Sequence, residues 1–220
     1  SLGDQCCEET VVPCIDFLPK AFRGKNSHGK RSIRNQSEVF EIFFGNITSL
    51  STKAGCFLEN CGSQVFLAVE THANKKSKNR WAKVWKKAGW RTFWADPEPS
   101  ANSEKGSYGG AVAGGRTHLQ IQPLCGWIED EKAPGSYFEA LPQHFTSGFQ
   151  VHLKNLTVLV LGGYHKGTLD PAVFKSWAAY SRNGELPFVA CPDFNCSAQA
   201  VIDSGFPEYC RQLCWYPANR

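Results

Sequence analysis

Three apolar runs in this sequence each stop at a carboxylate or an amide. The runs and the residues that end them are 40–45 with Asn46, 65–69 with Glu70, and 186–190 followed by Pro192-Asp193-Phe194-Asn195-Cys196. A short apolar run with such an end is typical of a buried strand, and side chains two residues apart on a strand point to the same face. The pattern therefore predicts a sheet protein whose strands deliver these polar side chains to one edge.

These strand ends carry the chemistry of a metal and phosphate site. Mg²⁺ prefers oxygen ligands and shares its shell with water and substrate phosphate, so carboxylates beside amides favour a site for a hard divalent cation and a phosphate. Each polar residue alone is also a common cap of the turn after a strand. Taken together, Glu70 and the pair Asp193 and Asn195 favour the functional interpretation.

Strand-like and helix-like patterns alternate from residue 38 onward, which predicts an α/β fold. The predicted strands are 40–46, 65–70, 90–94, 109–113, 117–123, 145–153, 157–163 and 188–193. The predicted helices are 51–60, 76–88 and 171–180, with a loop at 127–134. The two halves repeat a strand-turn-strand order that suits a two-sheet β-sandwich flanked by helices.

We expect one domain over residues 38–220, preceded by a flexible basic segment over residues 1–37. This segment has no acid between Asp16 and Glu38. Its basic residues there are Lys20, Arg23, Lys25, Lys30, Arg31 and Arg34. Such a run usually marks solvated chain, and it is also compatible with a weak nucleic-acid or nuclear-localisation patch.

Composition favours an intracellular protein. The 220 residues are enough for one sizeable core, 42% of them are hydrophobic, and no apolar run is long enough to span a bilayer. We expect no signal peptide, no membrane partner and a monomer, and the absence of Met suggests a fragment.

The ten cysteines form no CxxC pair, so we interpret them as scattered thiols rather than a zinc site. A secreted, disulfide-bonded enzyme is the alternative, supported by cysteine number and by sequons at Asn46, Asn155 and Asn195.

Residues 74–94 combine eight basic side chains with four tryptophans and contain no acid. Such a mixture can bind nucleic acid through phosphate contacts and base stacking. However, Trp81, Val84, Trp85 and Ala88 recur at helical spacing, which favours a helix packed through its tryptophans with its lysines outward. Both interpretations hold if the lysine face lies beside the site.

Five short motifs, in order, resemble the endonuclease/exonuclease/phosphatase superfamily of metal-dependent phosphoesterases. They are Gly45-Asn46-Ile47-Thr48-Ser49-Leu50, Val69-Glu70-Thr71-His72, Tyr108-Gly109-Gly110-Ala111-Val112, Gly163-Tyr164-His165 and Asp193-Phe194-Asn195. No single motif is specific, but their order and spacing are, over residues 38–198. The resemblance is greatest to the retroelement-associated branch, and it implies a four-layer αββα sandwich.

The resemblance also implies a role for each site residue. It makes Glu70 the ligand of Mg²⁺, with Mn²⁺ as a substitute, and Asn46 a metal-site and phosphate-orienting residue. Asp193 resembles the base that deprotonates the attacking water, and Asn195 the amide that binds the scissile phosphate. Tyr164 resembles a phosphate contact, and Tyr108 and His165 lie at positions that contact substrate.

Three departures from the family pattern affect the expected activity. Pro192 stands where the family has Gly, Lys166-Gly167 replaces a Pro-Asn pair, and no His follows His165. The family's final Ser-Asp-His motif is therefore missing, which predicts a C-terminally incomplete domain with weak or no turnover.

The expected function is Mg²⁺-dependent phosphodiester hydrolysis in nucleic acid, with DNA as the partner. Whether the chain is an active enzyme stays open. One alternative is a phosphatase or phosphodiesterase for a small or lipid phosphate, because the shared motifs do not distinguish substrates. The other is a degenerate, non-catalytic domain that binds nucleic acid.

Overall fold

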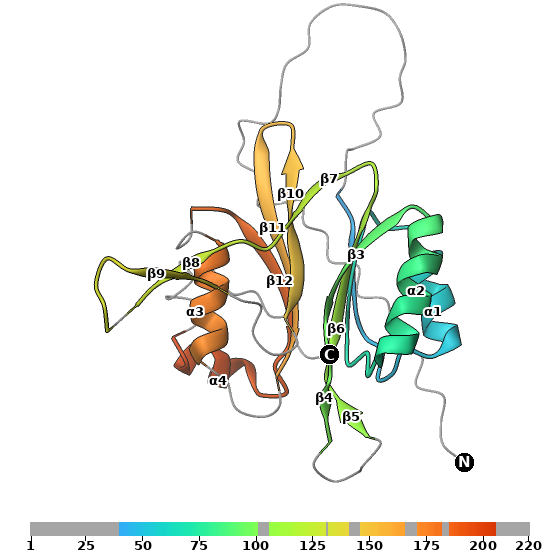
Figure 1. The fold of residues 1–220 in the computed structure, drawn as a ribbon, viewed down its shortest axis with the longest axis horizontal. Helices are drawn as coiled ribbons and strands as arrows, with labels where there is room; N and C mark the ends of the chain where they lie inside the picture. Colours follow the sequence, from blue (N-terminus) through green and yellow to red (C-terminus); the bar gives the residue numbers. More distant parts are fainter. Residues whose placement is uncertain are drawn as a thin grey trace, which may run out of the picture.

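The structure, a computed structural model, describes residues 40–100, 106–130, 132–140, 146–165, 171–181 and 185–205. Two four-stranded sheets face each other, and a helical layer covers the outer side of each sheet (Figure 1). The predicted α/β sandwich with four αββα layers is therefore confirmed. The predicted basic segment 1–37 lies outside the described residues.

The first sheet has the strand order β1-β2-β6-β3. Its strands are β1 (Ile42–Asn46), β2 (Val65–Val69), β6 (Ala111–Arg116) and β3 (Trp90–Ala95). Helices α1 (Thr52–Glu59) and α2 (Lys75–Lys87) cover its outer face. The side chains of Ser51 and Asn74 cap the two helices by accepting from the backbone N–H three residues later, which explains where each helix begins.

The second sheet has the strand order β12-β11-β10-β7. Its strands are β12 (Phe188–Asp193), β11 (Leu156–Tyr164), β10 (Ser147–Leu153) and β7 (Gln120–Pro123). Helices α3 (Pro171–Tyr180) and α4 (Ala198–Asp203) cover its outer face. Pro171 opens α3, where its missing N–H costs no intrahelical hydrogen bond.

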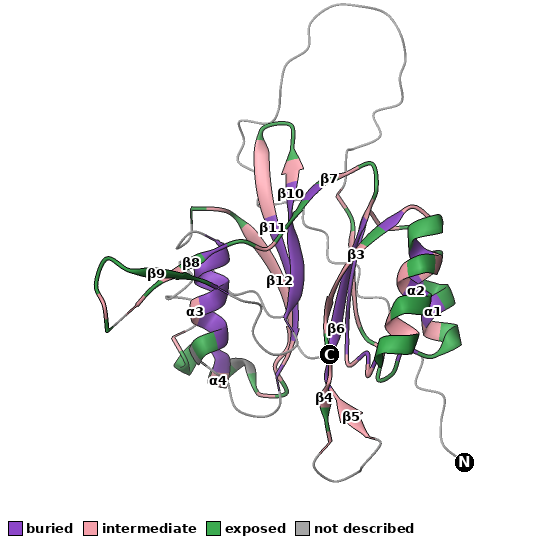
Figure 2. Cartoon of the chain, in the orientation of Figure 1, coloured by how far each residue is buried: buried purple, intermediate pink, exposed green. Residues whose placement is uncertain are grey.

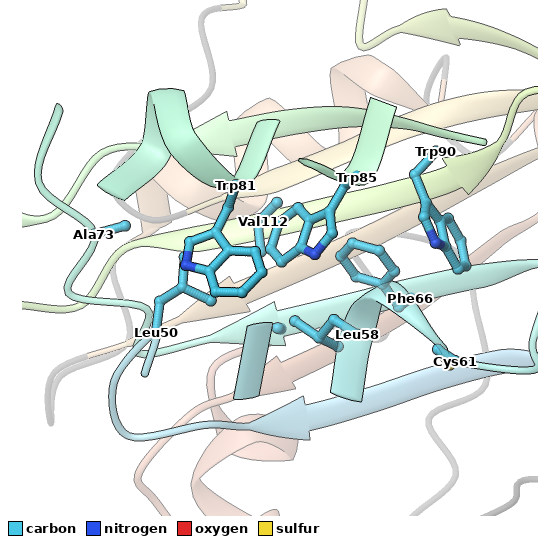
Figure 3. Packing of buried hydrophobic residues seen from close by; sticks show 10 residues of the cluster. Leu50, Leu58, Cys61, Phe66, Ala73, Trp81, Trp85, Trp90 and Val112 are labelled. Carbon is cyan, nitrogen blue, oxygen red and sulfur yellow. The ribbon is translucent and has the colours of Figure 1, made fainter. Parts of the chain in front are cut away.

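Tryptophans join α2 to the first sheet, as the helical spacing predicts. Trp81 and Trp85 are buried, and Trp85 packs edge-on against Phe66 of β2, with Trp90 on the other side of that ring (Figure 3). The indole Nε1 of Trp85 donates to the carbonyl of Gly55 at 3.0 Å, which ties α2 to α1. A Cβ at Gly55 would meet the Trp81 ring at 2.1 Å, so only glycine fits where the two helices meet.

The space between the sheets is filled by aliphatic and aromatic side chains. Leu67, Ala113, Phe149 and Val160 are among the residues of this inner core, all at most 1% exposed. Buried residues accordingly lie along the sheets and the inner helix faces, and exposed residues lie outside (Figure 2). Burial on both faces explains why the central strands read as continuous apolar runs.

Each sheet contains one parallel pair, and these pairs position the site. β1 pairs with β2 so that Asn46 lies opposite Val69, and β11 pairs with β12 so that Tyr164 lies opposite Asp193. Parallel strands end at the same edge of a sheet. The polar ends of all four strands therefore gather at the edge where both parallel pairs stop.

Several smaller elements differ from the sequence prediction. The predicted loop 127–134 contains strand β8 (Trp127–Glu129), which pairs with β9 (Tyr137–Glu139) in a hairpin. A second short hairpin joins β4 (Glu98–Pro99) to β5 (Ser107–Tyr108). Helix α4 was also not predicted. These segments are short and lack the apolar periodicity on which the prediction depends.

The five cysteines within the described residues, at positions 56, 61, 125, 191 and 196, carry no disulfide. This agrees with the interpretation of these five as thiols. No helix in the described part of the chain is both long and apolar enough to cross a membrane.

Candidate active site at the strand ends

A hydrogen bond across the sandwich joins the first and last predicted site motifs. Asn46 Nδ2, at the end of β1, donates to Asp193 Oδ2, at the end of β12, at 2.8 Å. The two residues are 147 positions apart and belong to different sheets. The structure thus brings together an amide and a carboxylate that the sequence analysis selected independently.

Both residues also cap the turn that follows their strand. The Thr48 N–H donates to Asn46 Oδ1 at 2.9 Å, and the Asn195 N–H donates to Asp193 Oδ1 at 3.2 Å. Each side chain thus uses one atom for the local turn common at strand ends and the other atom for the partner sheet. The local turn alone does not account for this second contact, which fixes the Asp193 carboxylate.

Tyr164 links Glu70 to the same cluster. The pKa of Tyr164 is raised to about 12 by partial burial first, then by a hydrogen bond to Glu70 and by the negative charges of Glu70 and Asp193, while a hydrogen bond with Asn195 acts in the opposite direction. The hydroxyl therefore keeps its proton at neutral pH and acts as a donor. Through Tyr164 the structure places Glu70, Asp193 and Asn195 around one hydroxyl group.

Asn195 also holds the end of β11. Its Nδ2 donates to the carbonyl of His165 at 2.8 Å, and the His165 N–H donates to the carbonyl of Asp193 at 2.8 Å. An asparagine amide has two N–H donors, so the His165 contact uses one and leaves the second for the hydrogen bond with Tyr164.

Backbone strain is concentrated at the site. Among the described residues, the non-glycine positions with positive φ are Thr48 (54°), Glu70 (55°), His72 (48°) and Asn195 (49°). All four lie in three of the five motifs, those that contain Asn46, Glu70 and Asp193. Left-handed conformations of this kind cost free energy and cluster at functional sites, where the surrounding structure imposes them.

We expect this strain to be measurable at Glu70. Because glycine tolerates positive φ, Glu70→Gly should be more stable than Glu70→Ala by about 1 kcal/mol in urea unfolding. Asn46, which has no positive φ, is the matched control, and there the glycine variant should be the less stable by about 0.5–1 kcal/mol. If the alanine variant is more stable than the glycine variant at both positions, the backbone of Glu70 is not strained.

The β4–β5 hairpin lies against the turn that follows Glu70. His72 Nδ1 lies 2.6 Å from the carbonyl of Ser107, and the N–H groups of Thr71 and His72 donate to the carbonyls of Gly110 and Gly109. The predicted substrate residue Tyr108 is on this hairpin, where its hydroxyl donates to Glu98. This contact of His72 with the hairpin was not predicted, although His72 stands in the second motif, two residues after Glu70.

His165 occupies a different environment from the one its predicted role requires. Its ring is buried, with the residue 5% exposed, and packs against Phe174, Trp177 and Phe194 beneath the site. The side chain supports the strand end from inside, and this placement does not favour direct substrate contact. Its role as a substrate residue stays a prediction.

No family sequence model and no curated protein sequence matches this chain. Among solved structures it is similar to the human Nocturnin catalytic domain with bound sulfate anion, with a TM-score of 0.51 and 10% identity over 76% of this chain and 67% of that chain. Two further structures have TM-scores of 0.43. They are the endonuclease domain of TRAS1, a telomere-specific non-LTR retrotransposon (11% identity, 76% and 68% covered), and an endonuclease/exonuclease/phosphatase family protein from Bacteroides thetaiotaomicron (12% identity, 74% and 68% covered).

The chain has the fold of the human Nocturnin catalytic domain. The resemblance carried by the five motifs is therefore confirmed at the level of the fold. The retroelement-associated branch stays a prediction.

Pro192 does not displace Asp193 from the strand-end site. It lies opposite Gly163 in the parallel ladder of β11 and β12, and Asp193 still reaches Asn46. Among the described strands β12 is an edge strand with one neighbour, the position at which a sheet tolerates proline. A second departure, Lys166-Gly167, lies outside the described residues.

The donor set fits a magnesium ion that shares its shell with solvent and substrate. The described residues contain no group of three or more His, Cys, Asp or Glu side chains that could hold a metal. Mg²⁺ bound beside a phosphate usually takes only one or two protein carboxylates. Glu70 and Asp193, both near enough to affect Tyr164, can supply these carboxylates, and Asn46 Oδ1 keeps a second lone pair beyond its bond from Thr48.

Proposed function

We propose that the strand-end site binds a divalent cation and hydrolyses phosphodiester bonds in nucleic acid. The observation that carries this proposal is the hydrogen bond from Asn46 to Asp193, which joins the ends of two sheets into one polar cluster. The turn cap alone does not require a partner in the opposite sheet. A catalytic carboxylate benefits from one, because a fixed orientation holds it in the reactive geometry.

The roles follow from the chemistry of each group. Asp193, held by Asn46 and by the Asn195 N–H, is oriented to accept the proton of an attacking water. Tyr164 remains protonated at neutral pH, so it can donate to a phosphate oxygen but cannot act as a base. Glu70 would hold Mg²⁺, whose positive charge, when the ion is bound, stabilises the negative charge of the phosphoryl group.

The oxyanion class of the substrate has support from the fold and from charge. The human Nocturnin catalytic domain, which has this fold, was solved with a bound sulfate, an oxyanion like phosphate. The net charge of +4 favours a polyanionic substrate over a neutral one. DNA as the substrate, Mg²⁺ as the cofactor and a nuclear location are parts of this proposal.

A second candidate function is nucleic-acid binding without turnover. The burial of His165 favours it, because that ring is not placed to donate to the transition state at the described site. Without such a donor the barrier would be higher by a few kcal/mol, while binding would be retained.

The experiment that tests the proposal compares substrates in Mg²⁺ and in EDTA. The protein should cleave a labelled DNA duplex or single strand in millimolar Mg²⁺, and it should not cleave in EDTA. Release of phosphate from inositol phosphates without cleavage of DNA would favour the small-phosphate alternative. DNA binding without cleavage in either condition would favour the non-catalytic domain.

We also expect Mg²⁺ to stabilise the fold through Glu70. Glu70 and Asp193 lie near one hydroxyl group and repel each other until a cation is bound, so Mg²⁺ at 100 times its Kd should add about 2.7 kcal/mol to the stability. Thermal melts with and without Mg²⁺ measure this effect, and Glu70→Gln should abolish it. Glu41→Gln, before the start of β1 at the opposite end of the strand from Asn46, is the matched control and should retain the shift. An equal shift in Glu70→Gln would place the metal elsewhere.

A further inference from the structure

The outward face of α2 carries a row of four cations. Lys76, Arg80, Lys83 and Lys87 are spaced i, i+4, i+7 and i+11, so they fall on one side of the helix, and all four are exposed. We call them the basic stripe. The opposite side of α2 holds the buried Trp81 and Trp85, which leaves the stripe facing away from the sheet (Figures 2 and 3).

The basic stripe does not help the helix to form. Helix α2 contains no acidic residue, and like charges at i, i+3 and i, i+4 are destabilising. Lys75 and Lys76 add positive charge to the first turn, where the helix dipole is already positive. Within the described part of the chain, the one ion pair of α2 joins Lys78 to Asp96 at 2.7 Å, and it involves no residue of the stripe. The fold therefore does not explain this charge pattern.

The stripe also has the form of a binding surface. A shallow, open depression on this face is lined by Lys75, Lys76, Asn79, Arg80 and Lys83. The Arg80 guanidinium lies 5.2 Å from the centroid of the Trp81 ring, which holds one cation of the stripe in place. The partner that fits a row of cations with no acid between them is a polyanion.

We propose that the basic stripe binds the sugar–phosphate backbone of nucleic acid, beside the strand-end site. This inference rests on the proposed function and adds a second contact surface to it. Lys76 stands six residues after Glu70, so their Cα atoms are at most about 22 Å apart. The stripe itself is about 16 Å long, which matches several phosphates along a strand spaced about 3.4 Å per nucleotide.

An anionic membrane is a poorer fit to the same charges. Helices that lie on membranes insert an apolar face between the lipids, and the apolar face of α2 is occupied by its contact with β2 and β3. The exposed side offers charge alone. Phosphate contacts of nucleic acid require only charge and hydrogen-bond donors, which the stripe supplies.

Neutralising two cations of the stripe tests the proposal. Lys76→Gln with Lys83→Gln leaves the contact of Arg80 with Trp81 intact, and Lys132→Gln with Lys154→Gln, two exposed lysines away from α2, is the control of equal charge change. Binding of a labelled 20-base-pair duplex of mixed sequence is measured by anisotropy in EDTA between 50 and 200 mM salt. EDTA keeps binding separate from hydrolysis.

We expect the stripe variant to bind at least about tenfold more weakly at 100 mM salt, and its slope of log K against log salt to fall by about 1.8. The control variant should bind like the wild type. Equal affinity and slope in the stripe and control variants, with unchanged melting temperatures, would overturn the inference. So would stripe-dependent binding to phosphatidylserine vesicles that is tighter than binding to the duplex. Stripe-dependent binding without any Mg²⁺-dependent cleavage would leave this inference standing and remove the proposed hydrolysis.

Discussion

Asp193→Asn should lower the rate of Mg²⁺-dependent phosphodiester cleavage by about 10²- to 10⁴-fold, the contribution expected of a general base. The substitution keeps the size of the side chain and an oxygen that can accept from Asn46, but it removes the charge that accepts a proton. Single-turnover cleavage of a labelled oligonucleotide, with enzyme in excess, measures the effect. Because only the chemical step is changed, nucleic-acid affinity in EDTA should stay within about twofold of the wild type.

Glu41→Gln is the matched control for this experiment. It removes one negative charge just before β1, whereas Asn46 lies at the other end of that strand. Its cleavage rate should equal that of the wild type. A rate in Asp193→Asn within about threefold of the control would exclude Asp193 as the base, since a base contributes at least about 10²-fold.

Trp85→Ala should lower the free energy of unfolding by about 3–5 kcal/mol, as expected for a large aromatic removed from a core. Trp85 is fully buried and stacks on Trp81 and Trp94, with ring centroids 5.6 and 5.4 Å away. Its loss also leaves the carbonyl of Gly55 without the indole donor. Urea unfolding measures the change, which is a large part of the about 5–15 kcal/mol that stabilises a typical domain.

Trp127 is the control for the tryptophan experiment. It lies on the β8–β9 hairpin and is 60% exposed, so Trp127→Ala removes the same side chain without opening a cavity. We expect a change within about 0.5 kcal/mol. A similar loss of unfolding free energy in Trp85→Ala and Trp127→Ala would mean that the helical layer over the first sheet does not depend on Trp85.

The positions of the long strands and helices could be predicted because each is set by local chemistry. The apolar runs before Asn46, Glu70 and Asp193 became β1, β2 and β12, and the helical spacing of Trp81 and Trp85 became the buried face of α2. The stopping points of the strands were also visible in sequence, because a carboxylate or amide ends each run.

Other features depend on contacts that sequence patterns do not record. The hairpins β4–β5 and β8–β9 have strands of two or three residues, too short for a period to be read. The burial of His165 depends on Phe174 and Trp177, which a helix more than five residues downstream brings over the strand end. The motif placed His165 next to Tyr164 in sequence. It could not show that the His165 ring is buried among aromatic side chains while the Tyr164 hydroxyl lies near Glu70 and Asp193.

The positive φ values could not be read from the sequence either. Glu70 and Asn195 adopt left-handed conformations without a glycine to indicate them. The surrounding turns impose these conformations through hydrogen bonds such as that from the Asn195 N–H to Asp193. Sequence reasoning therefore identified the residues of the site but not the strain with which the fold holds them.

The central claim is that Glu70 and Asp193 act in one site, and a double-mutant cycle tests it most directly. Single-turnover cleavage in Mg²⁺ is measured for the wild type, Glu70→Gln, Asp193→Asn and the double variant. When two residues act as a unit, the effects of their substitutions on the rate are strongly non-additive. The double variant should therefore be no more than about threefold slower than the slower single variant. A double variant as slow as the product of the two separate effects would contradict the claim, because it would show that Glu70 and Asp193 contribute independently.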